Sequence, residues 1–494
     1  MQSHRHSLAV CQPPGRPQPE GQALEVNRQD AEALHVAREL DRLGHDEDAK
    51  RAYLDHLQRH PDDAEVLTDL GNLAFRTRYR RAARTAYARV VQLRPFDPAA
   101  RVNLGNAWLD AGDLQAAQAE YEAALAVDPA FAPAHQGLSH VFAQLADDAT
   151  SRHHRDLGFA GNALAHVPYQ GEGTALRVLV LTSAAGGNFN TNWLLDPHRF
   201  DVVRLALDYV DARMPLPPHD VIVNAIGDAD LCQRELETAS CLIARSSARV
   251  VNAPVRVLNT GRVAHSEQLR AVAGTVVPRM ATIPKAAIAA GGEALLRGHG
   301  FDFPLLLRTP GHNTGRHFVK VARPTDLRAA LETLPGDQVL AIEYFDLAET
   351  GGWTRKYRVI AIDQELFPVH AAISADWKVH LFSASHAPEH QEEDARFLDD
   401  PRNVLPPGVL AALEAIVRRL GLDYAGVDFG IDAAGHLVLF EANATMSIHP
   451  VDPGDPFAYR RAAIGRIFAA FERMIGPPRA GQPKSEPVEV ERGE

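Results

Sequence analysis

The sequence predicts a multidomain protein in which an all-α solenoid of repeated helix pairs precedes a small α/β domain and a larger α+β domain. Three observations predict this fold class: a 34-residue repeat near the N-terminus, strands alternating with helical stretches in the middle, and paired strands in the C-terminal half. The chain has 494 residues, 46% of them hydrophobic and 23% charged, which suits a globular protein of several domains.

The repeat is visible as four residue types that return at one spacing. Leu70-Gly71 returns as Leu104-Gly105, Ala49 as Ala83 and Ala117, Tyr53 as Tyr87 and Tyr121, and Pro61 as Pro95 and Pro129. Helix-turn-helix units are expected at about 30–63, 64–97 and 98–131, with a capping helix near 132–146. This pattern resembles tetratricopeptide repeats, so we expect such a domain over 30–150. The resemblance implies a concave face that often binds a peptide. A mere spacer or a dimerisation surface remains an alternative.

Composition and charge narrow the classes of partner. A net charge of -12 and a pI of about 6.0 argue against nucleic acid or a membrane surface as the main partner. Cys11, Cys232 and Cys241 have no metal-ligand or redox spacing, which favours a reducing compartment, and we expect a cytoplasmic protein. No apolar run is long enough to span a bilayer. The polar ends, 1–29 and 476–494, are expected to be a flexible leader and a disordered tail.

The α/β domain is predicted after a linker over 151–176. A buried strand, RVLVLT, runs into Gly186-Gly187-Asn188, and further strands are expected within 220–228 and 248–254. The glycine pair either cradles an anionic group or forms only a tight turn, and both readings stay open here.

Basic residues and glycines follow in the next strands. One strand ends at Arg308 and another at Lys320, and the loop between them contains Gly311 and Gly315. Backbone amides and a cation together suit phosphate groups. QVLAIEYFD (338–346) reads as a strand that ends at Glu343, Tyr344, Phe345 and Asp346. The hairpin after it places Lys356 and Arg358 on one face, with its turn at Asp363-Gln364. Lys378 adds another cation before a loop expected over 383–405.

The segment LDYAGVDFGIDAAGHLVLFEANA (422–444) reads as a β-hairpin. Alternate side chains of a strand share a face, so Glu441 and Asn443 point the same way, and Asp428 falls opposite residues 439–441. Carboxylate and amide oxygens are ligands that Mg²⁺ accepts beside substrate phosphates. The alternative is a surface hairpin whose acids only keep it soluble.

In this order, the motifs from about 177 to 475 resemble the ATP-grasp superfamily, most closely its glutathione synthetase and ribosomal-protein glutamate ligase branch. The resemblance implies a pre-ATP-grasp α/β domain (177–256) and an ATP-grasp domain (257–475) with a lid at about 265–340. It further implies ATP held between two subdomains and a carboxylate joined to an amine through an acyl phosphate.

The resemblance also implies roles for individual residues. The metal ligands would be Asp428, Glu441 and Asn443. Glu343, Tyr344 and Phe345 would form the hinge along adenine, with Asp346 or Glu349 on the ribose. Arg358 would face the transferring phosphate, and Lys378 would help to offset charge. Arg262 and Arg308, with the loop of Gly311 and Gly315, would contact the phosphates. Two departures are that arginines stand where the family usually has lysines, and that Tyr357 replaces a common acid before the hairpin arginine.

The function expected on this basis is an ATP- and Mg²⁺-dependent carboxylate–amine ligase, with Mn²⁺ as an acceptable substitute. Its substrates are a carboxylate and an amine, and the repeats favour a peptide or protein among them. A homo-oligomer is compatible with the sequence. Two other functions remain: a non-catalytic nucleotide-binding scaffold, and an ATP-grasp kinase that phosphorylates a hydroxyl.

Overall fold

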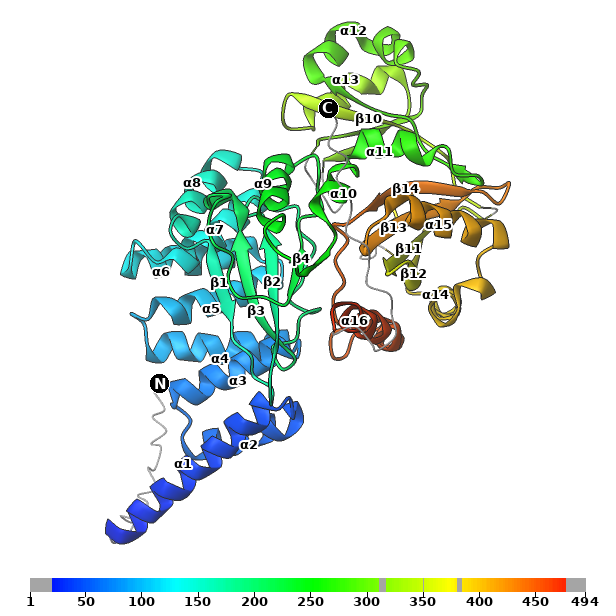
Figure 1. The fold of residues 1–494 in the computed structure, drawn as a ribbon. Helices are drawn as coiled ribbons and strands as arrows, with labels where there is room; N and C mark the ends of the chain where they lie inside the picture. The colour runs from blue at the N-terminus through cyan, green and yellow to red at the C-terminus, as the bar shows by residue number, and fades with distance from the viewer. Residues whose placement is uncertain (1–19, 311–316, 350, 380–383, 477–494) are drawn as a thin grey trace, which may run out of the picture.

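The computed structural model describes residues 20–310, 317–349, 351–379 and 384–476. Its N-terminal part consists of antiparallel helix pairs stacked side by side (Figure 1). The helices are α1 (Glu20–Arg42), α2 (Asp46–Arg59), α3 (Ala64–Arg76), α4 (Arg80–Leu93), α5 (Pro98–Asp110), α6 (Leu114–Val127), α7 (Ala132–Gln144) and α8 (Asp148–Phe159).

The recurring glycine and tyrosine explain why the helix pairs form. A Cβ atom on Gly71 would lie 2.6 Å from the ring of Tyr87, and one on Gly105 would lie 2.6 Å from the ring of Tyr121. Only glycine therefore lets the next helix pack its tyrosine at this depth. Aspartates cap several helices, as Asp97 does for α5 by accepting hydrogen bonds from two backbone amides.

The two ends of the repeat region differ from the expectations. The segment 151–176, expected as a linker, contains most of α8 and the strand β1 (Leu164–Val167). Helix α8 forms because Asp147 caps it and because Ser151 donates a hydrogen bond to the backbone of Ser139 on α7. At the other end, α1 begins at Glu20, inside the segment expected as a leader.

The first sheet follows the repeats and has the strand order β1-β3-β2-β4-β5. Its remaining strands are β2 (Leu176–Thr182), β3 (Phe200–Ala206), β4 (Val221–Asn224) and β5 (Arg249–Val251), with helices α9 (Gln233–Ile243) and α10 (Pro254–Leu258). Strands β2 to β5 are parallel, and only β1 runs antiparallel. The apolar run 178–181 is buried on both faces, as expected of a central parallel strand. Strand β3 was not anticipated.

The second sheet is antiparallel, in the order β7-β10-β8-β9. It comprises β7 (Met280–Pro284), β8 (Leu305–Arg308), β9 (Phe318–Val321) and β10 (Gln338–Glu343), with helices α12 (Lys285–Gly298) and α13 (Leu327–Glu332). These elements have a hydrophobic core of their own, centred on residues such as Ile288, Leu307 and Leu331.

The third sheet has the order β12-β11-β13-β14-β6. Its strands are β6 (Thr275–Val276), β11 (Thr354–Ile362), β12 (Glu365–Ser374), β13 (Tyr424–Ile431) and β14 (Leu437–Asn443). The associated helices are α11 (Arg262–Leu269), α14 (Pro388–Asp399), α15 (Pro407–Leu420) and α16 (Arg461–Ile475). Short 3₁₀ helices lie at Leu207–Tyr209, Pro324–Asp326, Pro401–Asn403 and Ala458–Arg460.

Two details of this sheet bear on the predictions. Asp363 and Gln364 have φ values of 47° and 68°, which is the two-residue hairpin turn expected between β11 and β12. The loop expected over 383–405 is wrong for most of its length, because α14 lies there. Asp394 anchors this helix, since its buried carboxylate accepts hydrogen bonds from the backbone of Ala371 and from Tyr459.

The solenoid contacts the segments that follow it at helices α1 and α8. Arg42, at the end of α1, donates to the backbone oxygen of Gln170, and Tyr209 donates to Asp156 on α8. Figure 1 shows the first sheet beside the helices of the repeats. In the described part of the chain, no helix combines the length and apolar character needed to cross a lipid bilayer.

Candidate functional site

A cavity of about 950 Å³ lies where the second sheet, the third sheet and the repeats meet. Its walls include Met280, Leu306 and Arg308 of the second sheet, Lys356, Arg358 and Asp428 of the third, and Arg78, Arg80 and Asp110 of the repeats. This volume is near the upper end of the range for small-molecule sites and leaves room for a nucleotide and a second molecule.

The β13–β14 hairpin has the register that the sequence predicts. Asp428 pairs with Glu441 across the two strands, and a bulge follows immediately, so that Phe429 pairs with Leu439. The asparagine two positions after Glu441 lies on the same face, and its Nδ2 donates to Glu441 Oε1 over 2.9 Å. The hairpin thus brings the three predicted magnesium ligands to one side of the sheet.

The carboxylate of Asp428 is held by two cations. Arg358, on β11, donates to it through Nε at 2.6 Å and through Nη2 at 2.8 Å, and Lys356 Nζ lies 2.6 Å from Oδ2. Burial opposes the charged form of Asp428, which is only 1% exposed. Lys356 and Arg358 outweigh this effect and hold the pKa of Asp428 below its ordinary value, so the carboxylate is ionised.

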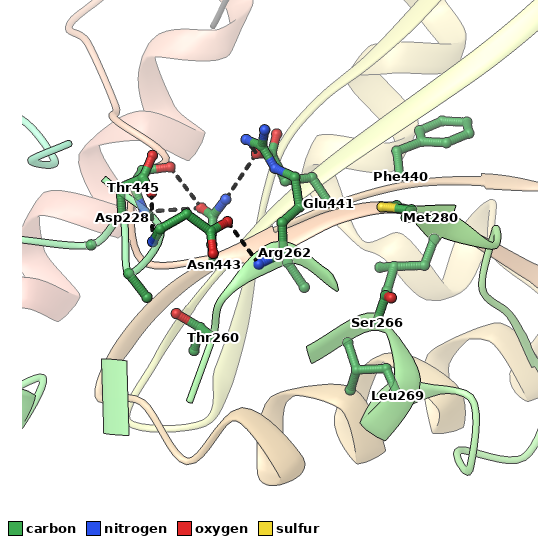
Figure 2. A pocket seen from close by; sticks show the side chains of 15 residues that line it. Asp228, Thr260, Arg262, Ser266, Leu269, Met280, Phe440, Glu441, Asn443 and Thr445 are labelled. Atoms are coloured by element: carbon green, nitrogen blue, oxygen red, sulfur yellow. Dashed lines mark hydrogen bonds and ion pairs between the residues drawn. The ribbon is translucent and has the colours of Figure 1, made fainter. Parts of the chain in front are cut away.

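Glu441 has a separate set of cations. Arg262 Nη2 donates to Glu441 Oε1 over 2.9 Å, and the backbone amide of Arg262, at the start of α11, donates to Asp230. Figure 2 shows Arg262 and Asn443 both directed at Glu441, and both donate to the same oxygen, Oε1. Burial raises the pKa of Glu441, but the charges of Arg262 and Arg308 outweigh it, so the net shift is downward.

Asp428, Glu441 and Asn443 offer the oxygen ligands that a hard divalent cation prefers. Two ionised carboxylates and one amide oxygen match the ligands of Mg²⁺. In the described residues, no three side chains among His, Cys, Asp and Glu cluster to hold a metal, but the predicted trio differs because it includes Asn443. Asn443 Oδ1 now accepts two hydrogen bonds from Thr445, so the amide must turn before its oxygen can join Glu441 at a cation.

Arg308 lies at the end of β8 and lines the same cavity. Burial and the nearby charge of Arg262 lower the pKa of Arg308 to about 10, although Glu441 partly offsets them. The arginine remains cationic at neutral pH. With Lys356, Arg358 and Arg262 it forms an excess of positive charge around the two hairpin carboxylates, of which Asp228 offsets a part. Such a wall favours a polyanion.

The predicted hinge lines the cavity, but the predicted ribose ligands do not. Glu343, Tyr344 and Phe345 are lining residues. Asp346 is exposed, and its carboxylate accepts from the backbone amide of Ala348 in a turn. Glu349 forms an ion pair with Arg355 instead. Neither acid is among the residues that line the cavity.

An aromatic cluster stands beside the hinge. Trp377 has its ring centroid 5.4 Å from that of Phe318 and 6.3 Å from that of Tyr344. Lys320 Nζ lies 3.7 Å from the centre of the Tyr344 ring, and Lys378 Nζ lies 6.0 Å from that of Phe318. Lys378 therefore lines this aromatic end of the cavity and not the Asp428 end. Gly311 and Gly315 lie outside the described residues.

The loop at Gly186-Gly187-Asn188 forms a turn that is closed by the Asn188 side chain. The Asn188 side chain accepts from the backbone amide of Ser183 and donates to its carbonyl, which closes the loop. Gly187 adopts a φ of 70°, and a Cβ there would lie 2.9 Å from the Cβ of Asp228. Gly187 and Asn188 nonetheless line the cavity, so both readings of the glycine pair stay open.

Several lining residues were not assigned to the site from the sequence. Lys356 stands two positions before Arg358 on the same strand, so its shared face was the available signal. Trp377 had no local signal beyond its aromatic type. The repeat residues Arg78, Arg80 and Asp110 could not be found, because nothing in a helical repeat indicates which of its turns meets a distant domain.

Comparisons with known proteins add limited information. No protein-family model matches the chain, and no curated protein matches it. A solved structure of VanG D-Ala:D-Ser ligase from Enterococcus faecalis is similar over 61% of this chain and 98% of its own, with 14% identity and a TM-score of 0.39. A structure titled MamA MSR-1 C2 is similar over 26% of this chain and 72% of its own, with 20% identity and a TM-score of 0.24. Both TM-scores are below 0.5, so neither likeness establishes a fold or a function for this chain.

Proposed function

We propose that the chain is an ATP- and Mg²⁺-dependent ligase of the ATP-grasp type that joins a carboxylate to an amine through an acyl phosphate. The observation that carries this proposal is the pairing of Asp428 with Glu441 on one hairpin, within a ring of cations on the wall of a large cavity. Carboxylates bind a metal ion, and an excess of cations binds phosphates. A metal–nucleotide complex therefore matches both features of the cavity.

The lining residues favour one orientation of the nucleotide in this cavity. Its base would lie at the hinge and aromatic cluster, where Tyr344, Phe345 and Trp377 line the wall. Its phosphates would then extend toward Arg308, Arg358 and the hairpin carboxylates. We propose that the second sheet, with α12 and α13, acts as the lid over the phosphates. Asp428, Glu441 and Asn443 would hold Mg²⁺, which supplies charge neutralisation between the phosphate oxygens.

The chemistry follows from the charges around the phosphates. A substrate carboxylate oxygen attacks the γ-phosphorus, the bond to the bridging oxygen of ADP breaks, and an acyl phosphate forms. The amine then attacks the acyl carbon, inorganic phosphate leaves, and the nitrogen loses a proton. Arg358 and Arg308 stabilise the negative charge that develops on the oxygens. No protein nucleophile takes part.

Glu441→Gln tests this function, because the substitution keeps the shape and removes one metal-ligand charge. We expect wild type to gain thermal stability from Mg²⁺ with a non-hydrolysable ATP analogue, and the variant to lose this gain. Hydroxylamine with a panel of carboxylates should trap a hydroxamate in wild type and less than about a hundredth as much in the variant.

Glu365→Gln is the matched control, because Glu365 is exposed in the same sheet next to a hairpin turn. It should behave as wild type in both assays. Nucleotide-linked stabilisation that survives unchanged in Glu441→Gln would refute the metal assignment. ADP release without hydroxamate, for every carboxylate offered, would refute the acyl phosphate.

A second candidate is a nucleotide-binding scaffold without turnover. The observation that favours it is that the Asp428 carboxylate is already engaged by Arg358 and Lys356. In this case the charges hold the sheet together and bind a nucleotide only as a structural ligand. Nucleotide binding without ADP release in the presence of all acceptors would support the scaffold over the ligase.

A further inference from the structure

The end of the cavity opposite the hinge is formed by the repeats. Arg78 lies between α3 and α4, Arg80 begins α4, Asp110 ends α5, and Asp452 lies in the segment after β14. We call these four residues the repeat-edge cluster. All four line the same cavity as Arg358 and Asp428. The solenoid is therefore a wall of the proposed catalytic cavity, in addition to any surface it offers elsewhere.

Arg78 fixes this wall. Its Nε donates to Asp452 at 2.7 Å, its Nη1 donates to Asp110 at 2.9 Å, and its guanidinium lies over the ring of Trp193. These contacts join the repeats to the first sheet's domain and to the segment after Asn443. Arg78 is only 6% exposed, so it is a positioning residue.

The backbone at Arg78 shows that this placement overrides the repeat's own preference. The same turn has a positive φ in each helix pair, and Gly44, Gly112 and Ala146 occupy it in the other three. Arg78 adopts a φ of 67° there, at a conformational cost of about 1 kcal/mol for a residue with a side chain. Ala146 shows that the turn tolerates a residue with a side chain, and at Arg78 the strained backbone places a guanidinium that bonds to Asp110 and Asp452.

Arg80 is the member of the cluster that is open to a ligand. Its Nε lies 3.0 Å from Asp110 Oδ2 and 3.1 Å from Asp452 Oδ2, and its side chain is 37% exposed. Among the residues that the structure describes, the buried Arg80 Nε has no hydrogen-bond partner, so its contacts with the two aspartates are ion pairs only. The aspartates orient the guanidinium, and its Nη atoms, which make no hydrogen bond within the described residues, would donate to a carboxylate's two oxygens.

His449 is close both to the repeat-edge cluster and to Arg358, where the acyl phosphate is proposed to form. It lines the cavity, and charges act on it from both sides, from Arg78, Asp110 and Asp452 as well as from Arg358. Burial, aided by Arg78, lowers the pKa of His449 despite the opposing aspartates. The imidazole is therefore neutral at physiological pH and does not repel an amine placed between the two ends.

We propose that the amine substrate is an amino acid and that Arg80, presented by the repeats, binds its carboxylate. This inference rests on the proposed ligase function and names the class of its second substrate. With the carboxylate on Arg80, the amino group points past His449 toward Arg358, where the acyl phosphate forms. A compact substrate also suits a cavity of about 950 Å³ that holds a nucleotide as well.

The test measures binding and needs no knowledge of the carboxylate donor. The probes are the common L-amino acids and their α-carboxamides, titrated calorimetrically into protein saturated with Mg²⁺ and a non-hydrolysable ATP analogue. The proteins are wild type, Arg80→Gln, Arg80→Lys and the control Arg89→Gln, whose arginine is exposed on the same helix.

We expect at least one amino acid to bind wild type and Arg89→Gln alike, and its carboxamide to bind about 10- to 100-fold more weakly. Arg80→Gln should weaken binding of the acid by the same factor and leave the carboxamide unchanged, with Arg80→Lys in between. Nucleotide affinity should be equal in all four proteins, which separates this site from the nucleotide site.

Two results would overturn the inference while leaving the ligase intact. One is that Arg80→Gln, with its unfolding midpoint near that of wild type, binds the amino acid as tightly as wild type does. The other is that no amino acid binds wild type although the nucleotide does. A wild-type protein that binds no nucleotide would instead refute the proposed function, and this inference with it. If Arg80→Gln is unstable, Arg80→Lys decides, because the loss of the forked geometry alone should weaken the acid and spare the carboxamide.

Discussion

Arg358 and Asp428 lie directly opposite each other on antiparallel strands β11 and β13, and their side chains form a two-pronged ion pair. Asp428 is 1% exposed, so its carboxylate depends on protein partners and not on water. The same carboxylate is a predicted magnesium ligand. In the proposed active site, Arg358 and Lys356 therefore occupy a carboxylate that is expected to bind magnesium. A metal–nucleotide complex has to displace these cations from Asp428 when it binds.

The first prediction concerns stability. Arg358→Gln removes the two hydrogen bonds that the guanidinium donates to a buried carboxylate and leaves it with Lys356, so we expect the free energy of unfolding to fall by roughly 3 kcal/mol. The double variant Arg358→Gln/Asp428→Asn should recover part of this loss, because the buried carboxylate that lost its two hydrogen bonds is removed as well and Lys356, which is partly exposed, keeps the remaining charge. Urea denaturation measures both. Arg328→Gln is the control, because the Arg328–Glu332 pair is exposed and should change stability by less than about 0.5 kcal/mol. Equal stability of the single and double variants would contradict the coupling.

The second prediction concerns the order of ligand binding. Asp428 and Glu441 are each engaged by cations, so Mg²⁺ alone should bind weakly, with a Kd in the millimolar range. With ADP present, the phosphates attract Lys356 and Arg262, and the carboxylates are released to the metal. We expect calorimetry to detect Mg²⁺ binding at least about tenfold tighter in the presence of ADP. Tight Mg²⁺ binding without a nucleotide would show that the ion pairs do not compete with the metal.

Local patterns were sufficient to predict the hairpin and its register. The alternation in VDFGID and HLVLFEAN and the short turn between them place Asp428 opposite residues 439–441, and in the structure it pairs with Glu441. The helix pairs were predictable for a similar reason, since Gly71 and Tyr87 recur one repeat later and contact each other within each unit. In both cases the interacting residues are close in the sequence.

Long-range packing accounts for what the sequence did not predict. Helix α14 depends on Asp394, which bonds to Ala371 and Tyr459 in distant segments. Strand β3 is held between β1 and β2 by sheet pairing. The repeat-edge cluster forms only because Arg78 and Asp452, far apart in the chain, meet across a domain boundary. No local periodicity carries such information.

The third prediction is a pH dependence of stability. His370 is 4% exposed, and burial, followed by the charge of Arg358, lowers its pKa well below 6.5 in the folded protein. Below pH 6.5 the unfolded chain binds a proton at this residue and the folded chain does not. The folded state therefore loses up to about 1.4 kcal/mol per pH unit from this group as pH falls.

His370→Gln should lose less stability between about pH 7 and about pH 5.5 than wild type, by roughly 1 kcal/mol in urea denaturation. His299→Gln, at an exposed position, should keep the wild-type dependence. An unchanged pH dependence in His370→Gln would contradict the assignment.

The fourth prediction uses the aromatic cluster to locate the nucleotide base. Trp377 lines the cavity beside Phe318 and Tyr344, whereas Trp353 packs against His390 and does not line the cavity. A base at the hinge changes the surroundings of Trp377 and should alter the tryptophan emission when Mg²⁺ and ADP are added. Trp377→Phe keeps an aromatic face, so we expect ADP affinity within about threefold of wild type but a loss of more than about half of the emission change. Trp353→Phe should retain the full change. If Trp377→Phe retains it while Trp353→Phe loses it, the base does not lie at this hinge, and the direction proposed for the nucleotide is wrong.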